Sequence, residues 1–279
     1  MFQWLKSIAK SKLVYPWARP IHRVVLAVAD FVLAIFFHLY PDLGRKKYNK
    51  MQKTQYKRYT GSFSDSKNLC VGAFDAHQSY PYEEYLLARY DGQKGLALDF
   101  ACGMGRMIDR MLPFFDRVDG VDLSSENIAY AQDYLTEKGW PENRFSLYQS
   151  SGLGVDLPET TYYDFIFSTI ALQHIPVYDI RRQIFSDLLK LLKPNGQCCF
   201  QIGFGWDNGT HWLDNHFSSR TTNAGHDVCV PNERHLEIIR KDFESIGFTN
   251  FQYDLKLSPH PELGDLYHPI WLFIYVERA

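Results

Sequence analysis

The chain has 279 residues, of which 46% are hydrophobic and 16% aromatic, and its formal net charge is −2. This composition argues against a largely disordered chain and favours one large α/β domain with an extension. The five cysteines are an odd number without C-x-x-C spacing, which argues against a disulfide framework or a zinc knuckle. A reducing, cytoplasmic location is expected.

Residues 1–60 differ in charge from the rest of the chain. They carry twelve lysines and arginines and two acidic residues, a net charge of +10, whereas the remainder has a net charge of −12.

The hydrophobic run 21–40 predicts a helix with a wide apolar face and basic flanks. Asp30 stands in its middle, where a charge costs at least ~2.5 kcal/mol in a bilayer, so this helix is expected to lie at a membrane surface rather than to span it. Packing on the body or on a second subunit is the alternative. The apolar run starts late and lacks a small-x-small site after it, which disfavours a cleaved signal peptide.

From Gly95 onward, short apolar runs alternate with helical patterns, which predicts βαβ units and a parallel sheet within a main domain of residues 61–279. The predicted strands are 96–101, 118–122, 144–149, 163–169 and 197–204, and the predicted helices are 105–115, 125–138, 180–192 and 232–246. Ser124 or Ser125 is expected to cap the second of these helices, and Pro194-Asn195-Gly196 is expected to turn into the fifth strand. The β-rich stretches 248–256 and 269–278 lack a helical crossover between them, so they predict an antiparallel hairpin.

A glycine-bearing turn follows the first predicted strand, in Leu98-Asp99-Phe100-Ala101-Cys102-Gly103-Met104-Gly105-Arg106. Glycines there let backbone amides approach a ligand, and the helix that follows offers further donors. Asp99 would repel a pyrophosphate, but it suits a ligand that carries a cationic amino acid group. Asp122 ends the second strand, where an acid can bind both hydroxyls of a ribose.

With these motifs, the chain from about residue 80 to its end resembles the class I, Rossmann-like S-adenosylmethionine-dependent methyltransferases of the small-molecule type. The resemblance implies a doubly wound, seven-stranded, mostly parallel sheet that ends in an antiparallel hairpin, here with an N-terminal helical extension. It also implies S-adenosyl-L-methionine as the cofactor, with the adenine near the segment after the third strand. The implied cofactor-binding residues are Asp99, Ala101, Gly103, Gly105, Asp122, Leu123, Ser151, Gly152 and Thr169.

Two positions depart from the family's pattern. Ala101 replaces the first glycine of its motif, which is tolerable if the backbone there has a negative φ. An acidic or Asn side chain after the third strand often binds the adenine amino group in this family, and here only Ser151 or the backbone is available for that contact.

His174 is the candidate catalytic residue, because it follows the fourth strand at the sheet edge where open α/β sheets bind ligands. A neutral imidazole can accept a proton from a hydroxyl or an amine. The alternative is a histidine whose hydrogen bonds only hold the loop.

The long segment 205–231 is predicted to form a lid over the substrate. Its histidines match no metal-ligand spacing, so no metal is expected. The candidate substrate-binding residues are Tyr80, Gln173, Trp206, His211, Trp212 and His216.

The sequence therefore predicts transfer of a methyl group from S-adenosylmethionine to O or N, and less readily to C or S, of a small or lipid-like molecule. A nicotinamide-dependent oxidoreductase is one alternative, although Ile108 stands where its third glycine would be. A non-catalytic, membrane-docked scaffold that binds the cofactor is the other. Nucleic acid is not expected as a partner, because the body is acidic and QHIP follows the fourth strand in place of an Asn/Asp-Pro-Pro-aromatic tetrad.

Overall fold

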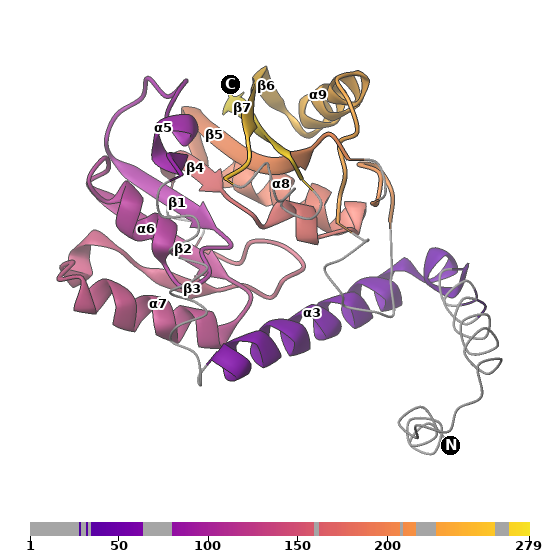
Figure 1. Cartoon of the computed structure of the whole chain (residues 1–279), viewed down its shortest axis with the longest axis horizontal. Coiled ribbons are helices and arrows are strands. Elements are labelled where there is room, and N and C mark those ends of the chain that lie inside the picture. Colours follow the sequence, from indigo (N-terminus) through magenta and orange to yellow (C-terminus); the bar gives the residue numbers. More distant parts are fainter. Residues whose placement is uncertain are drawn as a thin grey trace.

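Figure 1 shows a computed structural model of the chain. The structure describes residues 28, 32, 35–63, 80–158, 162–206, 209–215, 227–259 and 268–279, with side chains in the first helix described up to residue 54. The elements are α3 (Pro41–Phe63), α5 (Tyr82–Leu86), β1 (Leu96–Phe100), α6 (Arg106–Met111), β2 (Arg117–Asp122), α7 (Ser125–Glu137), η1 (Glu142–Arg144), β3 (Leu147–Gln149), β4 (Tyr163–Ser168), η2 (Leu172–His174), α8 (Tyr178–Leu191), β5 (Leu192–Phe204), α9 (Arg234–Ile246), β6 (Phe248–Leu257) and β7 (Ile270–Arg278).

The strands form one seven-stranded sheet in the order β3-β2-β1-β4-β5-β7-β6, with helices on both faces (Figure 1). Pairing from β3 across to β5 is parallel, and β7 is antiparallel to both of its neighbours, β5 and β6. The order reverses direction at β1, so the crevice between β1 and β4 is the switch point at which such sheets bind ligands. The predicted parallel sheet with a terminal antiparallel hairpin is confirmed.

Side chains of the central strands alternate between two apolar cores, one on each face of the sheet. In β1, Leu98 belongs to one core and Ala97 to the other, and in β4 the same holds for Ile166 and Phe165. A sheet that is buried on both faces needs apolar residues at successive positions, and this explains the unbroken apolar runs of these strands. The sheet is therefore a fixed frame whose strand ends position the loops.

Several predicted boundaries were shifted. The strand β5 begins at Leu192, five residues before the predicted start, and Pro194-Asn195-Gly196 lies inside it at a register irregularity opposite β4, with Asn195 at φ +61°. The helix α6 ends at Met111 rather than at residue 115. The predicted cap of α7 is confirmed: the Ser124 hydroxyl accepts a hydrogen bond from the Asn127 backbone N–H at 3.2 Å.

The helix α3 runs along the body and on past it in the direction of the N-terminus (Figure 1). Tyr48, at 6% exposure, belongs to the core that contains Leu98 and Phe100, so the packing of the domain includes a helix that the sequence assigned mostly to the extension. Among the described residues, none of the helices combines the length and the hydrophobicity that a membrane span requires.

Candidate active site

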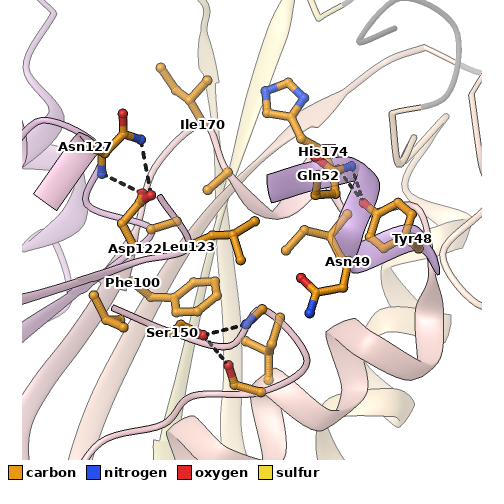
Figure 2. A pocket seen from close by; sticks show the side chains of 18 residues that line it. Tyr48, Asn49, Gln52, Phe100, Asp122, Leu123, Asn127, Ser150, Ile170 and His174 are labelled. Carbon is orange, nitrogen blue, oxygen red and sulfur yellow. Dashed lines mark hydrogen bonds between the residues drawn. The ribbon is translucent and has the colours of Figure 1, made fainter. Parts of the chain in front are cut away.

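A cavity of about 230 Å³ opens at the carboxyl ends of the central strands (Figure 2). Its wall comes from the segments after β1, β2, β3 and β4, and it is completed by α3. The lining residues are Tyr48, Asn49, Gln52, Phe100, Ala101, Gly103, Val121, Asp122, Leu123, Asn127, Ser150, Gly152, Gly154, Ile170, Ala171, His174, Ile175 and Ile184. Of the predicted cofactor-binding residues, the cavity thus collects those at 101, 103, 122, 123 and 152, together with the predicted catalytic histidine.

Asp122, at the end of β2, presents its carboxylate in a fixed orientation. Its Oδ2 accepts a hydrogen bond from the Gly103 N–H at 3.0 Å, and its Oδ1 accepts from the Ser124 N–H at 2.8 Å and from the Asn127 amide at 3.1 Å. Burial raises the pKa of this carboxyl, and the hydrogen bonds from these backbone and side-chain donors partly offset the rise. The glycine turn and the acid therefore form one unit at the cavity wall.

Asp99, in β1, is buried at 2% exposure and does not line the cavity. Its Oδ2 has no hydrogen-bond partner within the described part of the chain. Burial raises the pKa of Asp99 well above its usual range; the positive charge of Arg106 opposes this rise and the negative charge of Asp122 adds to it. The end of β1 thus holds a buried carboxylate oxygen that accepts no hydrogen bond from any residue that the structure describes.

The turn between β1 and α6 is built from left-handed residues. Gly103 and Gly105 have φ of +53° and +85°, and a Cβ placed on Gly103 would have open space around it, while one on Gly105 would come within 3.2 Å of Ala131. Ala101 has φ +61°, so the negative φ that would make alanine tolerable at this glycine position is not what the structure has. A non-glycine residue there costs of order ~1–2 kcal/mol. This strain lies at the ligand-facing wall, where strained residues tend to cluster.

The segment after β3 is held by its own hydroxyl. The Ser150 Oγ donates to the Gly154 carbonyl at 2.7 Å and accepts from the Gly152 N–H at 3.0 Å (Figure 2). The predicted contact Ser151 is exposed, and the structure brings its backbone carbonyl to α3, where Asn49 donates to it at 2.7 Å.

His174 lies in η2 and lines the cavity. Its Nδ1 is 3.0 Å from the Asp227 Oδ1, and its backbone carbonyl accepts a hydrogen bond from the Tyr48 hydroxyl at 3.0 Å. The buried His268 has its Nε2 3.8 Å from the Asp227 Oδ2, within ion-pair range but too far for a hydrogen bond. Burial alone would raise the pKa of Asp227, but the two imidazoles outweigh it and lower that pKa. Asp227 is therefore an ionised partner that engages one ring nitrogen of His174 and leaves Nε2 for another group.

The other predicted residues of the β1 turn and of the segment after β4 do not line the cavity. Thr169 comes just before the lining residues Ile170 and Ala171. Gly105 and Gln173 also lie outside the lining, and Gln173 is buried.

The predicted substrate-binding residues Tyr80 and Trp212 do not line the cavity either. Tyr80 is buried against Trp271 and donates to the Leu257 carbonyl at 2.7 Å. Trp212, at 2% exposure, packs in the core, and its indole N–H donates to Asp242 at 2.7 Å. Burial of the large apolar ring with its N–H satisfied stabilises the fold, so the side chain is not available to a substrate.

The predicted lid is described only in part. Trp206 packs against His268, and His211 is exposed and stacks on His235. None of these residues lines the cavity, whereas His216 lies outside the described residues. The lid as a whole therefore stays a prediction.

Sequence reasoning did not identify two parts of the site. Asp227 falls in the long segment 205–231 but was not predicted to contact His174, and Tyr48, Asn49 and Gln52 of α3 were not predicted to belong to the site. Asn49 and Gln52 are three positions apart in the sequence, as residues on one helix face are, but nothing in the sequence indicates that this face meets the cavity or that Tyr48 is buried.

Comparisons with known proteins agree with this geometry. Residues 97–196 match the family model described as "Methyltransferase domain". A curated relative, the N-terminal Xaa-Pro-Lys N-methyltransferase 1-B of Xenopus laevis, is 37% identical over 155 residues, which are 55% of this chain and 61% of the relative. An uncharacterized methyltransferase of Schizosaccharomyces pombe is 31% identical over 105 residues, 36% of each chain. The chain thus spans from about a third to three fifths of the length of these relatives.

Solved structures show the same fold. An S-adenosylmethionine-dependent methyltransferase from Clostridium acetobutylicum has a TM-score of 0.52 at 15% identity, covering 80% of this chain and 99% of that one. The phosphoethanolamine N-methyltransferase 2 of Haemonchus contortus has a TM-score of 0.55 at 17% identity, covering 78% of this chain and 59% of that one. Residues 97–196 thus match a methyltransferase domain, and the chain has the fold of the class I, S-adenosylmethionine-dependent methyltransferases. S-adenosylmethionine is the cofactor of this class.

Proposed function

We propose that the protein transfers a methyl group from S-adenosylmethionine to O or N of a small or lipid-like molecule. The observation that carries this proposal is the unit formed by the glycine turn and Asp122, in which the Gly103 N–H fixes a carboxylate at the cavity wall. A carboxylate held in this way suits the paired hydroxyls of a ribose, and the open space at Gly103 admits a ligand close to the backbone.

The residues present fit the cofactor at its other end as well. One carboxylate oxygen of Asp99 is buried beside the glycine turn and has no hydrogen-bond partner among the described residues. A cationic amino acid group would supply a hydrogen-bond donor and the opposite charge. Asp122 would thus hold the sugar and Asp99 the amino acid. When bound, S-adenosylmethionine supplies an electrophilic methyl group, and the protein's contribution is orientation and proton handling.

We infer that His174 takes the proton of the acceptor at its Nε2. Asp227 accepts the Nδ1–H of the same ring, which fixes the tautomer in which Nε2 carries a lone pair. Phe100, Ile170 and Ile175 line the same cavity with apolar side chains, which limit the number of water molecules that it can hold in an ordered way.

Binding measurements test the proposal against its alternatives. Isothermal titration of the full chain with S-adenosylmethionine and, separately, with NAD is expected to show binding of the methyl donor and none of NAD. Incubation with methyl-labelled donor and an extract of small molecules and lipids is then expected to yield a labelled low-mass product. Binding of NAD alone would favour the oxidoreductase, and binding without transfer to any acceptor would favour the scaffold. A labelled peptide amino terminus would instead point to the acceptor named for the Xenopus relative.

We also propose that residues 1–60 contact an anionic membrane surface. Val28, Val32, Ile35, Phe36 and Leu39 are exposed, and lysines and arginines follow them in α3. Exposed apolar side chains next to basic ones are typical of segments that lie on anionic lipid. In flotation with vesicles that contain phosphatidylserine, the wild type is expected to float and the double variant Phe36→Asp, Leu39→Asp to remain at the bottom. Equal flotation of both proteins, or equal binding to uncharged vesicles, would contradict this contact.

A further inference from the structure

The amide of Asn49 meets the cavity with only half of its hydrogen-bonding capacity used. From α3, its Nδ2 donates to the Ser151 carbonyl at 2.7 Å, which fixes which way the amide faces. Its Oδ1 is shielded from solvent and receives no hydrogen bond from any residue that the structure describes. Figure 2 shows this side chain directed from the helix toward the segment after β3. A buried acceptor without a donor is costly, so the position favours a ligand that brings one.

The neighbours of Asn49 determine which part of a ligand lies there. A Cβ on Gly152 would come within 2.6 Å of the Asn49 Oδ1 and 2.4 Å of the Leu123 side chain, and Gly152 has φ +85°. A glycine is therefore required for α3 to approach this closely. Leu123 and the backbone after β3 line the cavity next to Asn49, and an apolar side chain beside glycine backbone suits a flat ring.

The direction of a bound nucleoside follows from the two acids. Asp122 lies between the glycine turn after β1 and the segment after β3, because β1, β2 and β3 are adjacent in the sheet. If the amino acid end lies toward Asp99 and the sugar at Asp122, the base must extend past Leu123 toward Gly152. This step rests on the function proposed above.

We propose that the Asn49 Oδ1 accepts a hydrogen bond from the exocyclic amine of the adenine. The adenine contact is then supplied by a helix residue that lies 102 positions before Ser151 in the chain. The short polar side chain at Ser151 has no such role, since only its backbone carbonyl serves, as the anchor that orients the Asn49 amide.

Two ligands that differ at the base test this contact. S-adenosylhomocysteine carries the amine, whereas S-inosylhomocysteine has a carbonyl oxygen at the same place. For the wild type, titration calorimetry is expected to give a dissociation constant about tenfold lower for the adenosyl ligand, because the oxygen would leave Asn49 without a donor. Asn49→Ala is expected to bind the two ligands about equally.

The variant Asn49→Asp distinguishes a hydrogen bond to the adenine amine from the hydrogen bond that attaches α3 to Ser151. Aspartate loses the donor to Ser151, as alanine does, but it keeps an acceptor at the position of Oδ1. Asn49→Asp is therefore expected to retain the preference for the adenosyl ligand, while the exposed neighbour variant Lys50→Ala behaves as the wild type. Loss of the preference for the adenosyl ligand in both Asn49 variants would show that the residue only attaches α3 to the body. Persistence of that preference in Asn49→Ala would show that another group binds the adenine amine. Either result overturns the proposal. A wild type that binds neither ligand would overturn the proposed function itself.

Discussion

Replacing His174 by glutamine is expected to lower the rate of methyl transfer by about 10²- to 10⁴-fold, the usual contribution of general acid–base catalysis. Glutamine approximates the size of the imidazole but cannot take up a proton. The affinity for S-adenosylmethionine is expected to stay within about threefold of the wild type, since Asp122 and the glycine turn are untouched. The rate is measured with labelled donor at saturation, and the affinity by titration.

The carboxylate behind the imidazole provides a matched comparison. Asp227→Asn removes the charge that His174 faces at 3.0 Å and is expected to reduce the rate in the same direction without weakening donor binding. As Asp227 is a positioning residue, its effect is expected to vanish in the His174→Gln background, so that the double variant is no slower than the single one. An unchanged rate in His174→Gln would leave the histidine with only its loop contacts. Additive losses would mean that Asp227 acts independently of it.

Much of the sheet was predictable, because parallel strands buried on both faces produce apolar runs that alternate with helical patterns. The runs around Leu98 and Ile166 are examples. Boundaries were harder to predict, since Pro194-Asn195-Gly196 is a turn sequence that the pairing of β4 and β5 absorbs as an irregularity inside a strand. There the backbone pairing between β4 and β5 on both sides of these three residues outweighs their own preference for a turn between elements.

The part of the site that comes from strand ends was predictable for the same reason: residues that follow parallel strands meet at one edge. This brought Ala101, Asp122 and His174 to one cavity. What came from long-range packing was not predictable, because neither the docking of α3 through Tyr48 nor the pairing of Asp227 with His174 leaves a local pattern. Trp212 is the converse case, a loop aromatic that looked available for ligand and instead fills the core.

The substitution Asp99→Asn is expected to maintain or raise the stability of the ligand-free domain while it weakens binding of S-adenosylmethionine. Because burial raises the pKa of Asp99, the folded state prefers the protonated acid, and stability is lost as the pH rises from the ordinary range of an aspartate through the raised pKa. The asparagine has no charge to bury. The ligand-free variant is therefore expected to unfold at a temperature equal to or above that of the wild type, with a gap that widens as the pH rises toward and through the raised pKa of the wild-type acid. Thermal unfolding without ligand, across that range, measures it.

The same substitution is expected to weaken binding of S-adenosylmethionine by about 10- to 100-fold, the loss typical of one charge-assisted hydrogen bond. In the wild type, affinity is expected to increase with pH as Asp99 ionises to meet the cationic amino group, and in Asp99→Asn this slope is expected to disappear. Asp119 supplies the control, as a buried carboxylate of β2 that pairs with Arg117 at 2.7 Å. Asp119→Asn is expected to lower stability and leave the pH dependence of binding intact. Equal affinity of Asp99→Asn and wild type at every pH would show that the buried acid supports the turn and does not bind the ligand.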